Sequence, residues 1–278
     1  MNSKREIELV VISDTHLGSY GSRAEELFNY LNSINPKKIV LNGDIIDFWQ
    51  FKKRNWDKYH TKAIKKLVEF ISQGVQVYYI AGNHDESFRR FLNFEIHGFK
   101  ILNKISLNLD GKKAWFFHGD VFDVAMQHSR WLTRLGSIGY EFLIFLNFII
   151  NRLLSFFGKE KLSFSKKIKN GVKAAVSYIN KFESVVSEIG IQNKFDYVIC
   201  GHIHQPIIKT VTIGKSSIQY LNSGDWIENL TALEYNNKQW SLYSYNSKDF
   251  KDLNENQSFK KPNELFSELI SEINLYHL

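Results

Sequence analysis

Three short apolar segments in the first third of the chain each run directly into polar residues. "VVISDTHLGS" spans residues 10–19, "KKIVLNGD" spans 37–44 and "VQVYYIAGNHD" spans 75–85. Short apolar runs bounded by glycine and polar residues are typical of buried strands. Helical patterns separate these strands, so we expect a parallel sheet in which the carboxyl ends of the strands share one edge. The polar residues that follow the strands are expected to meet at that edge.

The two intervening helical patterns carry their own start and stop signals. Ser22 is followed three positions later by Glu25, which predicts a capping box at the start of the first helix. The second helix is expected to end at Gly74. Its apolar face is predicted to consist of Ile64, Leu67, Val68 and Ile71.

The second half of the chain changes character. Residues 105–117 alternate as in a hairpin, with Asp110 and Gly111 at the turn. Residues 125–190 have a helical pattern, and short strands return after residue 195. We predict an α/β fold, a two-sheet mixed β-sandwich flanked by helices. It would form one domain over residues 1–246 with a helical insertion at about 125–190, followed over residues 247–278 by a polar linker and a C-terminal amphipathic helix.

Composition sets the class of protein and hints at its partners. The 278 residues are 44% hydrophobic, which is enough for one large domain. The 36 Lys and Arg residues exceed the 29 Asp and Glu residues, and the formal charge of +7 suggests phosphates, nucleic acid or acidic lipid as partners. A merely basic surface is the alternative. No signal-length apolar run opens the chain, so we expect a cytoplasmic protein. The single cysteine, Cys200, is expected to be a buried, inert thiol.

The polar residues at the strand ends form an ordered series of candidate metal ligands. Any one His or Asp at such a place is more often structural, but the set lacks thiolates and suits Mn²⁺, Zn²⁺ or Fe²⁺. One carboxylate can bridge two ions, and a pair of ions can support phosphoryl transfer. Glycines beside the ligands allow close backbone approach. The series comprises Asp14, His16, Asp44, Asp47, Asn83, His84, Asp85, His118, His202 and His204.

The ordered motifs DxH, GDxxD, GNHD, HGD and GHxH, which run from residue 14 to residue 204, resemble those of the calcineurin-like metallophosphoesterases. The resemblance implies a two-sheet sandwich with a centre of two divalent ions, with Mn²⁺ expected first and Zn²⁺ or Fe²⁺ as alternatives. His84 would be the general acid or would stabilise phosphoryl charge, and Asp85 would orient it. Asp47 and Asp120 are expected to be structural supports. One ion would be held by Asp14, His16 and His204, the other by Asn83, His118 and His202, and Asp44 would bridge them.

The insertion bears on the substrate. Residues 138–157, "IGYEFLIFLNFIINRLLSFF", form an amphipathic pattern with a broad apolar face. Such a helix can be buried against its own domain. Flanking basic residues also suit a surface that receives acyl chains and phosphates. Lys166, Lys167 and Lys173 are therefore candidate substrate contacts, together with Asn83 and His84, although solvation alone explains surface lysines equally well.

The stretches "SDTHLG", "GDIIDFW" and "GNHDE", with a helical insertion after HGD, resemble the UDP-2,3-diacylglucosamine pyrophosphatase branch of bacterial lipid A synthesis. That resemblance implies hydrolysis of a lipid-linked diphosphate to UMP and a lipid monosaccharide phosphate. It also implies a peripheral position on the cytoplasmic face of the inner membrane. We expect neither nucleic acid nor an obligate protein partner. The best-known members carry Arg where this chain has His84. A soluble nucleotide or nucleic-acid phosphodiesterase and a non-catalytic interaction module remain the alternatives.

Overall fold

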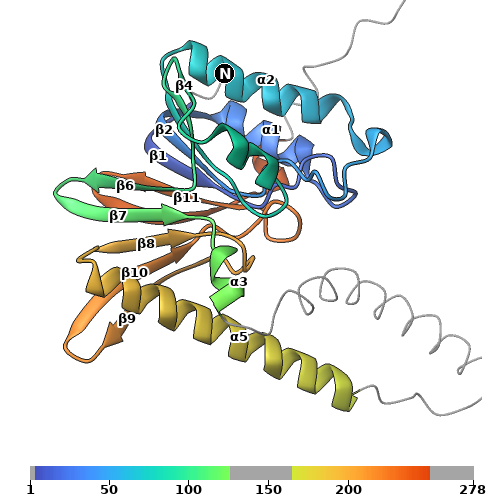
Figure 1. The fold of residues 1–278 in the computed structure, drawn as a ribbon. Helices are drawn as coiled ribbons and strands as arrows, with labels where there is room; N and C mark the ends of the chain where they lie inside the picture. Colours follow the sequence, from blue (N-terminus) through green and yellow to red (C-terminus); the bar gives the residue numbers. More distant parts are fainter. Residues whose placement is uncertain (1–3, 126–164, 251–278) are drawn as a thin grey trace, which may run out of the picture. The chain divides into compact units, whose positions relative to one another are not determined.

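A computed structural model describes residues 4–125 and 165–250, without the side chains at 124–125 and 165–174. The chain divides into two units, Met1–Ser244 and Tyr245–Leu278. The first unit carries every strand of the described residues (Figure 1). In the second unit the described residues include one short 3₁₀ helix, η3 (Ser247–Phe250).

Within the described part of the first unit, one sheet has seven strands in the order β12-β11-β1-β2-β3-β5-β4. Strands β1, β2, β3 and β5 are parallel to one another, whereas β11, β12 and β4 pair antiparallel. The parallel part is the sheet predicted from the apolar runs. The strands are β1 (Arg5–Ile12), β2 (Ile34–Asn42), β3 (Gln76–Ile80), β4 (Glu95–Ile96), β5 (Phe99–Leu102), β11 (Thr231–Asn236) and β12 (Gln239–Ser244).

The second sheet has five strands in the order β6-β7-β8-β10-β9, counted over the same described residues. Its central strands β7, β8 and β10 are parallel, and β6 and β9 pair antiparallel at the edges. The hairpin predicted at Asp110 and Gly111 is confirmed, with both residues at positive φ. The strands are β6 (Lys104–Leu109), β7 (Lys112–Phe117), β8 (Tyr197–Cys200), β9 (Ile207–Ile213) and β10 (Ser216–Asn222).

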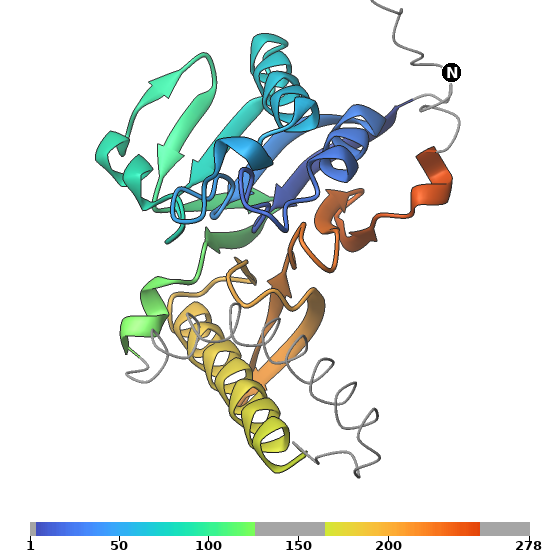
Figure 2. The same ribbon diagram turned by 90° about the vertical axis from the view of Figure 1, so that its right-hand side faces the viewer.

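Helices cover the outer faces of the sheets. In Figure 1 and Figure 2, α1 (Ala24–Ser33) and α2 (Lys58–Ser72) lie together on the first sheet, and α5 (Ser165–Gln192) lies along the second. Phe182 and Val186 of α5 pack against Val198 and Tyr220. Shorter helices are η1 (Lys53–Asn55), η2 (Glu86–Phe91) and α3 (Val121–Ala125). None of the described helices has the length and apolar character needed to cross a membrane.

The main core lies between the two sheets. Leu9, Val40 and Ile80 of the first sheet share one buried cluster with Phe116 and Ile199 of the second. Because alternate side chains of a strand face opposite sides of its sheet, each strand contributes to this core and to the helix-covered layer. The predicted fold class, an α/β sandwich of two mixed sheets with flanking helices, is therefore confirmed.

The predicted capping box of the first helix is wrong. Helix α1 begins at Ala24 with Arg23 at the N-cap, and no side chain caps it. The hydroxyl of Ser22 instead donates to the carbonyl of Thr15 at 3.1 Å, in the loop that follows β1. A capping box is present at α2, where Asp57 and His60 make the two reciprocal bonds.

Two predicted helices lie outside the described residues. They are the amphipathic stretch 138–157 and the C-terminal helix beyond residue 262. Residues 165–190 of the predicted insertion are helical and belong to α5, while α3 ends at residue 125, where the insertion was expected to begin. Helix α2 ends as expected, with Gly74 in a left-handed conformation at φ 86° just beyond it.

Cys200 is fully buried at the end of β8, as predicted. Burial raises the pKa of its thiol to about 12, although Tyr220 and Asn222 partly oppose the rise. Since the thiolate is the reactive form, we expect native protein at pH 8 to show no reaction with Ellman's reagent over an hour. Protein unfolded in guanidinium should release one equivalent of the coloured thiolate. Rapid labelling of native protein would contradict this placement.

Candidate metal centre

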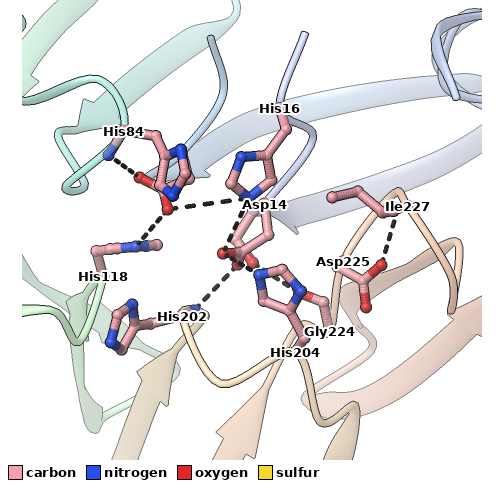
Figure 3. A network of polar contacts seen from close by, with 12 residues as sticks. Asp14, His16, His84, His118, His202, His204, Gly224, Asp225 and Ile227 are labelled. Atoms are coloured by element: carbon pink, nitrogen blue, oxygen red, sulfur yellow. Dashed lines mark hydrogen bonds and ion pairs between the residues drawn. The ribbon is translucent and has the colours of Figure 1, made fainter. Parts of the chain in front are cut away.

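The predicted site residues lie at strand ends of both sheets. Asp14 follows β1 and Asp44 follows β2, while His118 comes directly after β7 and His202 follows β8. Figure 3 shows Asp14, His118 and His202, together with His16, His84 and His204, gathered around a common centre. The parallel strands explain the convergence, because their carboxyl ends meet at one edge.

One group joins Asp14, His16 and His204, with ligand atoms all within 4.8 Å of one another. His204 Nε2 lies 3.1 Å from Asp14 Oδ1, and His16 Nε2 lies 4.0 Å from the same oxygen. The other oxygen, Oδ2, accepts the backbone N–H of His202 at 3.0 Å. The carboxylate is thus fixed at one oxygen and offers the other to two imidazoles.

A second group joins Asp44, His118 and His202. His118 Nδ1 donates to the carbonyl of Asn42 at 2.9 Å, and its Nε2 faces Asp44 Oδ2 at 3.2 Å. A backbone carbonyl bonded to one ring nitrogen fixes the tautomer and leaves the other nitrogen free to bind a cation. His202 is held in a similar way, because its Nε2 lies 3.0 Å from Asp123 Oδ2.

Asp44 lies between the two groups. Its Oδ2 is 3.2 Å from His118 Nε2 and 3.9 Å from His16 Nε2. Its Oδ1 accepts the backbone N–H of His84 at 2.8 Å. A third candidate group, His16, Asp44 and His84, again includes this carboxylate. Asp44 is therefore placed where a bridging carboxylate would have to be.

Unpartnered polar atoms at this centre fit a bound cation. Asp14 Oδ1, His16 Nε2, His118 Nε2 and Asn83 Oδ1 are buried, and each lacks a hydrogen bond in the described residues. Buried polar atoms without partners are rare in native proteins. Carboxylate, amide and imidazole atoms aimed at one another are the donor set that binds borderline divalent metals. The residues present therefore fit the divalent ions that the sequence predicts.

The backbone at the centre is also unusual. Five candidate ligands adopt left-handed conformations, with φ between 44° and 65°. Such conformations cost about 1 to 3 kcal/mol each at non-glycine residues and concentrate at functional sites. The five residues are Asp14, His16, Asp44, His202 and His204.

Glycines leave room for the ligands. A Cβ atom at Gly82 would lie 2.2 Å from Asp44 Oδ1, and one at Gly201 would lie 2.5 Å from Asp14 Oδ2. Both distances are shorter than any real contact, so a side chain at either position would displace a carboxylate.

We expect Gly82→Ala to weaken metal binding by about 10- to 100-fold, because the new methyl group moves Asp44. Metal content after dialysis against graded free Mn²⁺ measures the effect. Gly214→Ala is the control, since nothing lies within 4 Å of a Cβ built there, although it carries a positive φ of 62°. Equal metal retention by both variants would contradict the proposed role of Asp44.

The charges of the centre favour ionised carboxylates, the form that binds cations. Burial alone would raise the pKa of Asp14, but attraction to the nearby His204 imidazole outweighs burial and lowers the pKa to about 2. Burial opposes protonation of His204, yet Asp14 raises its pKa to about 9. For Asp44, His118 overcomes the effect of burial and holds the pKa well below its usual range.

His84 lies at the rim of the centre. Its Nδ1 is 3.0 Å from Asp47 Oδ2, an oxygen that also lies 3.2 Å from His16 Nδ1. Its ring packs on Trp49 with centroids 4.4 Å apart. Burial acts to lower the pKa of His84, but Asp47 and Asp44 raise it above the usual value. Asp47 is thus a support, as expected, and it orients His84.

Asp85 does not take the place expected for it. Its Oδ1 accepts the backbone N–H of Gly82 at 2.6 Å, while its Oδ2 accepts the N–H of Ile45 and the hydroxyl of Tyr79. Among the described residues its hydrogen bonds thus join the loops after β2 and β3 and do not reach His84. Burial and the nearby Asp44 charge raise its pKa.

Other residues complete the surroundings of the centre. Asp123 of α3 orients His202 and accepts the hydroxyl of Tyr178. The sequence analysis did not predict this role, although Asp123 lies close to His118 in the stretch "HGDVFD". Asp120 is a structural support, as expected, since its Oδ2 accepts a hydrogen bond from Arg89 Nη2 at 2.6 Å. The predicted substrate contacts Lys166, Lys167 and Lys173 fall in the part of α5 whose side chains lie outside the description.

The fold and this centre define a metal-dependent phosphoester hydrolase. A family model described as "Calcineurin-like phosphoesterase" matches residues 7–206, and the chain belongs to this family.

Similar proteins carry a common name. A "UDP-2,3-diacylglucosamine hydrolase" of Aliivibrio fischeri is 26% identical over 250 residues, covering 87% of this chain and 99% of its own length. One of Blochmanniella pennsylvanica with the same name is 24% identical, covering 84% and 93%. Among solved structures, an archaeal phosphodiesterase is 14% identical, covers 85% of this chain and 98% of its own, and has a TM-score of 0.40.

Proposed function

We propose that this protein hydrolyses the diphosphate of a lipid-linked nucleotide sugar such as UDP-2,3-diacylglucosamine, releasing UMP and a lipid monosaccharide phosphate. The observation that carries the hydrolysis is the convergence of carboxylate and imidazole ligands around Asp44. The substrate class is supported by relatives named for UDP-2,3-diacylglucosamine, which match over nearly their whole lengths.

In this proposal the two groups of ligands hold two divalent ions, with Mn²⁺ as the first candidate and Zn²⁺ or Fe²⁺ as alternatives. The ions, when bound, supply positive charge for the phosphoryl oxygens and lower the pKa of a water molecule. Asp44, which faces both His16 and His118, would be the ligand common to the two ions. The remaining ligands divide into Asp14, His16 and His204 for one ion and Asn83, His118 and His202 for the other.

His84 provides the proton. Asp47 fixes the ring through Nδ1, so Nε2 is the atom that can donate to the leaving-group oxygen or bond to a phosphoryl oxygen. The raised pKa of His84 favours the protonated form that this role needs. Asn83, adjacent in the chain, would contact the same phosphate. Asp85 acts indirectly, by holding together the loops that carry Asp44 and His84.

We further propose that the protein acts on the cytoplasmic face of the inner membrane as a peripheral protein. A substrate with acyl chains resides in a bilayer, and the basic composition, with a formal charge of +7, favours an anionic lipid surface. In this setting Lys166, Lys167 and Lys173 are the candidate contacts to the diphosphate. No protein partner is required by the proposed chemistry.

Incubation of purified protein with Mn²⁺ and UDP-2,3-diacylglucosamine in detergent micelles tests the substrate. We expect UMP and the lipid monosaccharide phosphate to form in equal amounts, and EDTA to abolish the reaction. The matched comparison is UDP-glucose, which carries the same diphosphate without acyl chains and should turn over at least about 100-fold more slowly, because remote binding energy is lost. No UMP from the lipid substrate would refute the substrate assignment.

A second candidate function is hydrolysis of soluble nucleotides or nucleic acid, which the calculated pI of about 9.2 favours. Binding to nucleic acid would weaken steeply with salt. Two results would favour this function over the first. Cleavage of single-stranded oligonucleotides would be lost as the salt concentration rises from about 50 to about 200 mM. The activity would also be independent of detergent and lipid.

A further inference from the structure

The loop between β2 and α2, which lies beside the carboxyl ends of the first sheet (Figure 1), carries a pocket that the metal chemistry does not use. The pocket is shallow and open to solvent on one side, with a volume of about 430 Å³. We call it the aromatic pocket. It is lined by Ile46, Phe48, Phe51, Lys53 and Trp56.

The aromatic pocket is built on the same loops as the metal centre. Ile46 forms a β-bridge with Leu17, and the backbone N–H of Phe48 donates to the carbonyl of His84 at 3.0 Å. Asp47, between these two lining residues, contacts both His16 and His84. The aromatic pocket and the support of the metal centre therefore share one loop.

Phe51 ties the pocket to the loop that carries His16. A Cβ atom at Gly18 would come within 2.5 Å of the Phe51 ring, so this ring rests directly on the glycine. The backbone N–H of Lys52 also donates to the carbonyl of Gly18, at 3.3 Å. Phe51 is thus held against Gly18, which follows the candidate metal ligand His16 by two positions.

The walls of the pocket are ordered and yet accessible. Trp56 Nε1 donates to Thr61 Oγ1 at 3.1 Å, and the Trp56 and Phe51 rings pack with centroids 5.6 Å apart. Phe48 packs on Phe88 in the same way. Nevertheless Phe48 is 45% exposed and Phe51 is 46% exposed. Aromatic rings that are already fixed by their neighbours, but still have an exposed face, can stack on a planar ligand with little further loss of side-chain entropy.

The charge at the pocket complements a phosphate. Lys53 lines it, and Lys52 and Arg54 are exposed beside it on the same short segment. Aromatic walls with a cationic rim, on the loop that also carries Asp47, match a ligand that has both a planar ring and a phosphate. An acyl chain would match a wall of aliphatic side chains better, and Ile46 is the one aliphatic residue among those that line this pocket.

We propose that the aromatic pocket binds the base of the nucleotide half of the substrate, while the attached phosphate reaches the metal centre. This inference rests on the proposed function, because it assigns the nucleotide half of the proposed substrate to the aromatic pocket. The lipid half would then lie on another side of the centre.

Calorimetric titration of the Mn²⁺-loaded protein with UMP and with ribose 5-phosphate tests the inference. The two probes share sugar and phosphate and differ in the base. Stacking of the base should make UMP bind at least about tenfold more tightly. In Phe51→Leu this preference should fall to about twofold, with ribose 5-phosphate unchanged, because the stacking face is lost.

Phe94→Leu is the matched control, since Phe94 is 47% exposed and lies outside the pocket. It should keep the full preference for UMP, and metal content should be equal in all three proteins. Equal affinity for the two probes in the unaltered protein would overturn the inference. So would tighter binding of octyl phosphate than of UMP, lost in Phe51→Leu, because an acyl chain would then occupy the pocket.

The failures of the two proposals can be distinguished. If UDP-2,3-diacylglucosamine is not hydrolysed but Phe51 still determines the preference for UMP, the substrate assignment fails and the nucleotide pocket stands. If the lipid substrate is hydrolysed while Phe51→Leu leaves the preference for UMP intact, the pocket assignment alone is refuted.

Discussion

Asp44→Asn is expected to reduce hydrolysis of the lipid-linked diphosphate by on the order of 10³-fold, since charge stabilisation by bound metal contributes several kcal/mol to phosphoryl transfer. The replacement keeps the shape of the side chain and removes the negative charge that two groups of ligands share. It also leaves His118 and His16 facing a neutral amide, 3.2 and 3.9 Å from the original oxygen. Metal analysis by mass spectrometry should show fewer bound ions per chain than in the unaltered protein.

The control for this experiment is Asp249→Asn, an equal change of charge at an exposed position in the second unit of the chain. Thermal unfolding of both variants separates loss of metal from loss of fold. An Asp44→Asn protein that is folded, fully loaded with metal and as active as the unaltered protein would contradict the bridging role.

His84→Gln should lower the turnover rate by roughly 10²- to 10⁴-fold, which is the usual contribution of a positioned proton donor. In contrast to Asp44→Asn, we expect the bound metal to be retained, because His84 lies at the rim and contacts Asp47 through Nδ1. Turnover with a substrate whose leaving group is already a good one, such as bis(p-nitrophenyl) phosphate, should fall much less than turnover of the lipid diphosphate. That split distinguishes proton donation from a purely structural role.

His97→Gln serves as the matched control. His97 is exposed and belongs to none of the candidate groups of metal ligands among the described residues. This variant should retain its turnover with both substrates. If His84→Gln slows both substrates equally and also loses metal, His84 is a ligand or a support and the proposed proton transfer is wrong.

The fold was predictable because local signals and long-range packing agree. The runs ending at Ile12, Asn42 and Ile80 are short, apolar and separated by helices, and a parallel sheet is the arrangement that buries them. The start of α1 was not predictable from its capping pattern. The Ser22 hydroxyl donates to the carbonyl of Thr15, in the loop of the metal centre, and that contact with the preceding loop leaves no trace in helix periodicity.

The candidate ligands were predictable for the same reason, since side chains after parallel strands converge. The residues that orient them were harder to assign. Asp47 and Asp85 both follow the strand motifs, yet Asp47 contacts His84 while Asp85 bonds to the loops around Gly82 and Ile45. The difference depends on how loops fold over one another. Asp123 and the aromatic pocket depend on such loop packing as well, so spacing in the sequence carries little information about them.

Anomalous X-ray diffraction from crystals grown with Mn²⁺ tests the central claim most directly. We expect two peaks on either side of the Asp44 carboxylate, one among Asp14, His16 and His204 and the other among Asn83, His118 and His202. A single peak, or peaks away from these side chains, would contradict the metal centre on which the proposed hydrolysis depends.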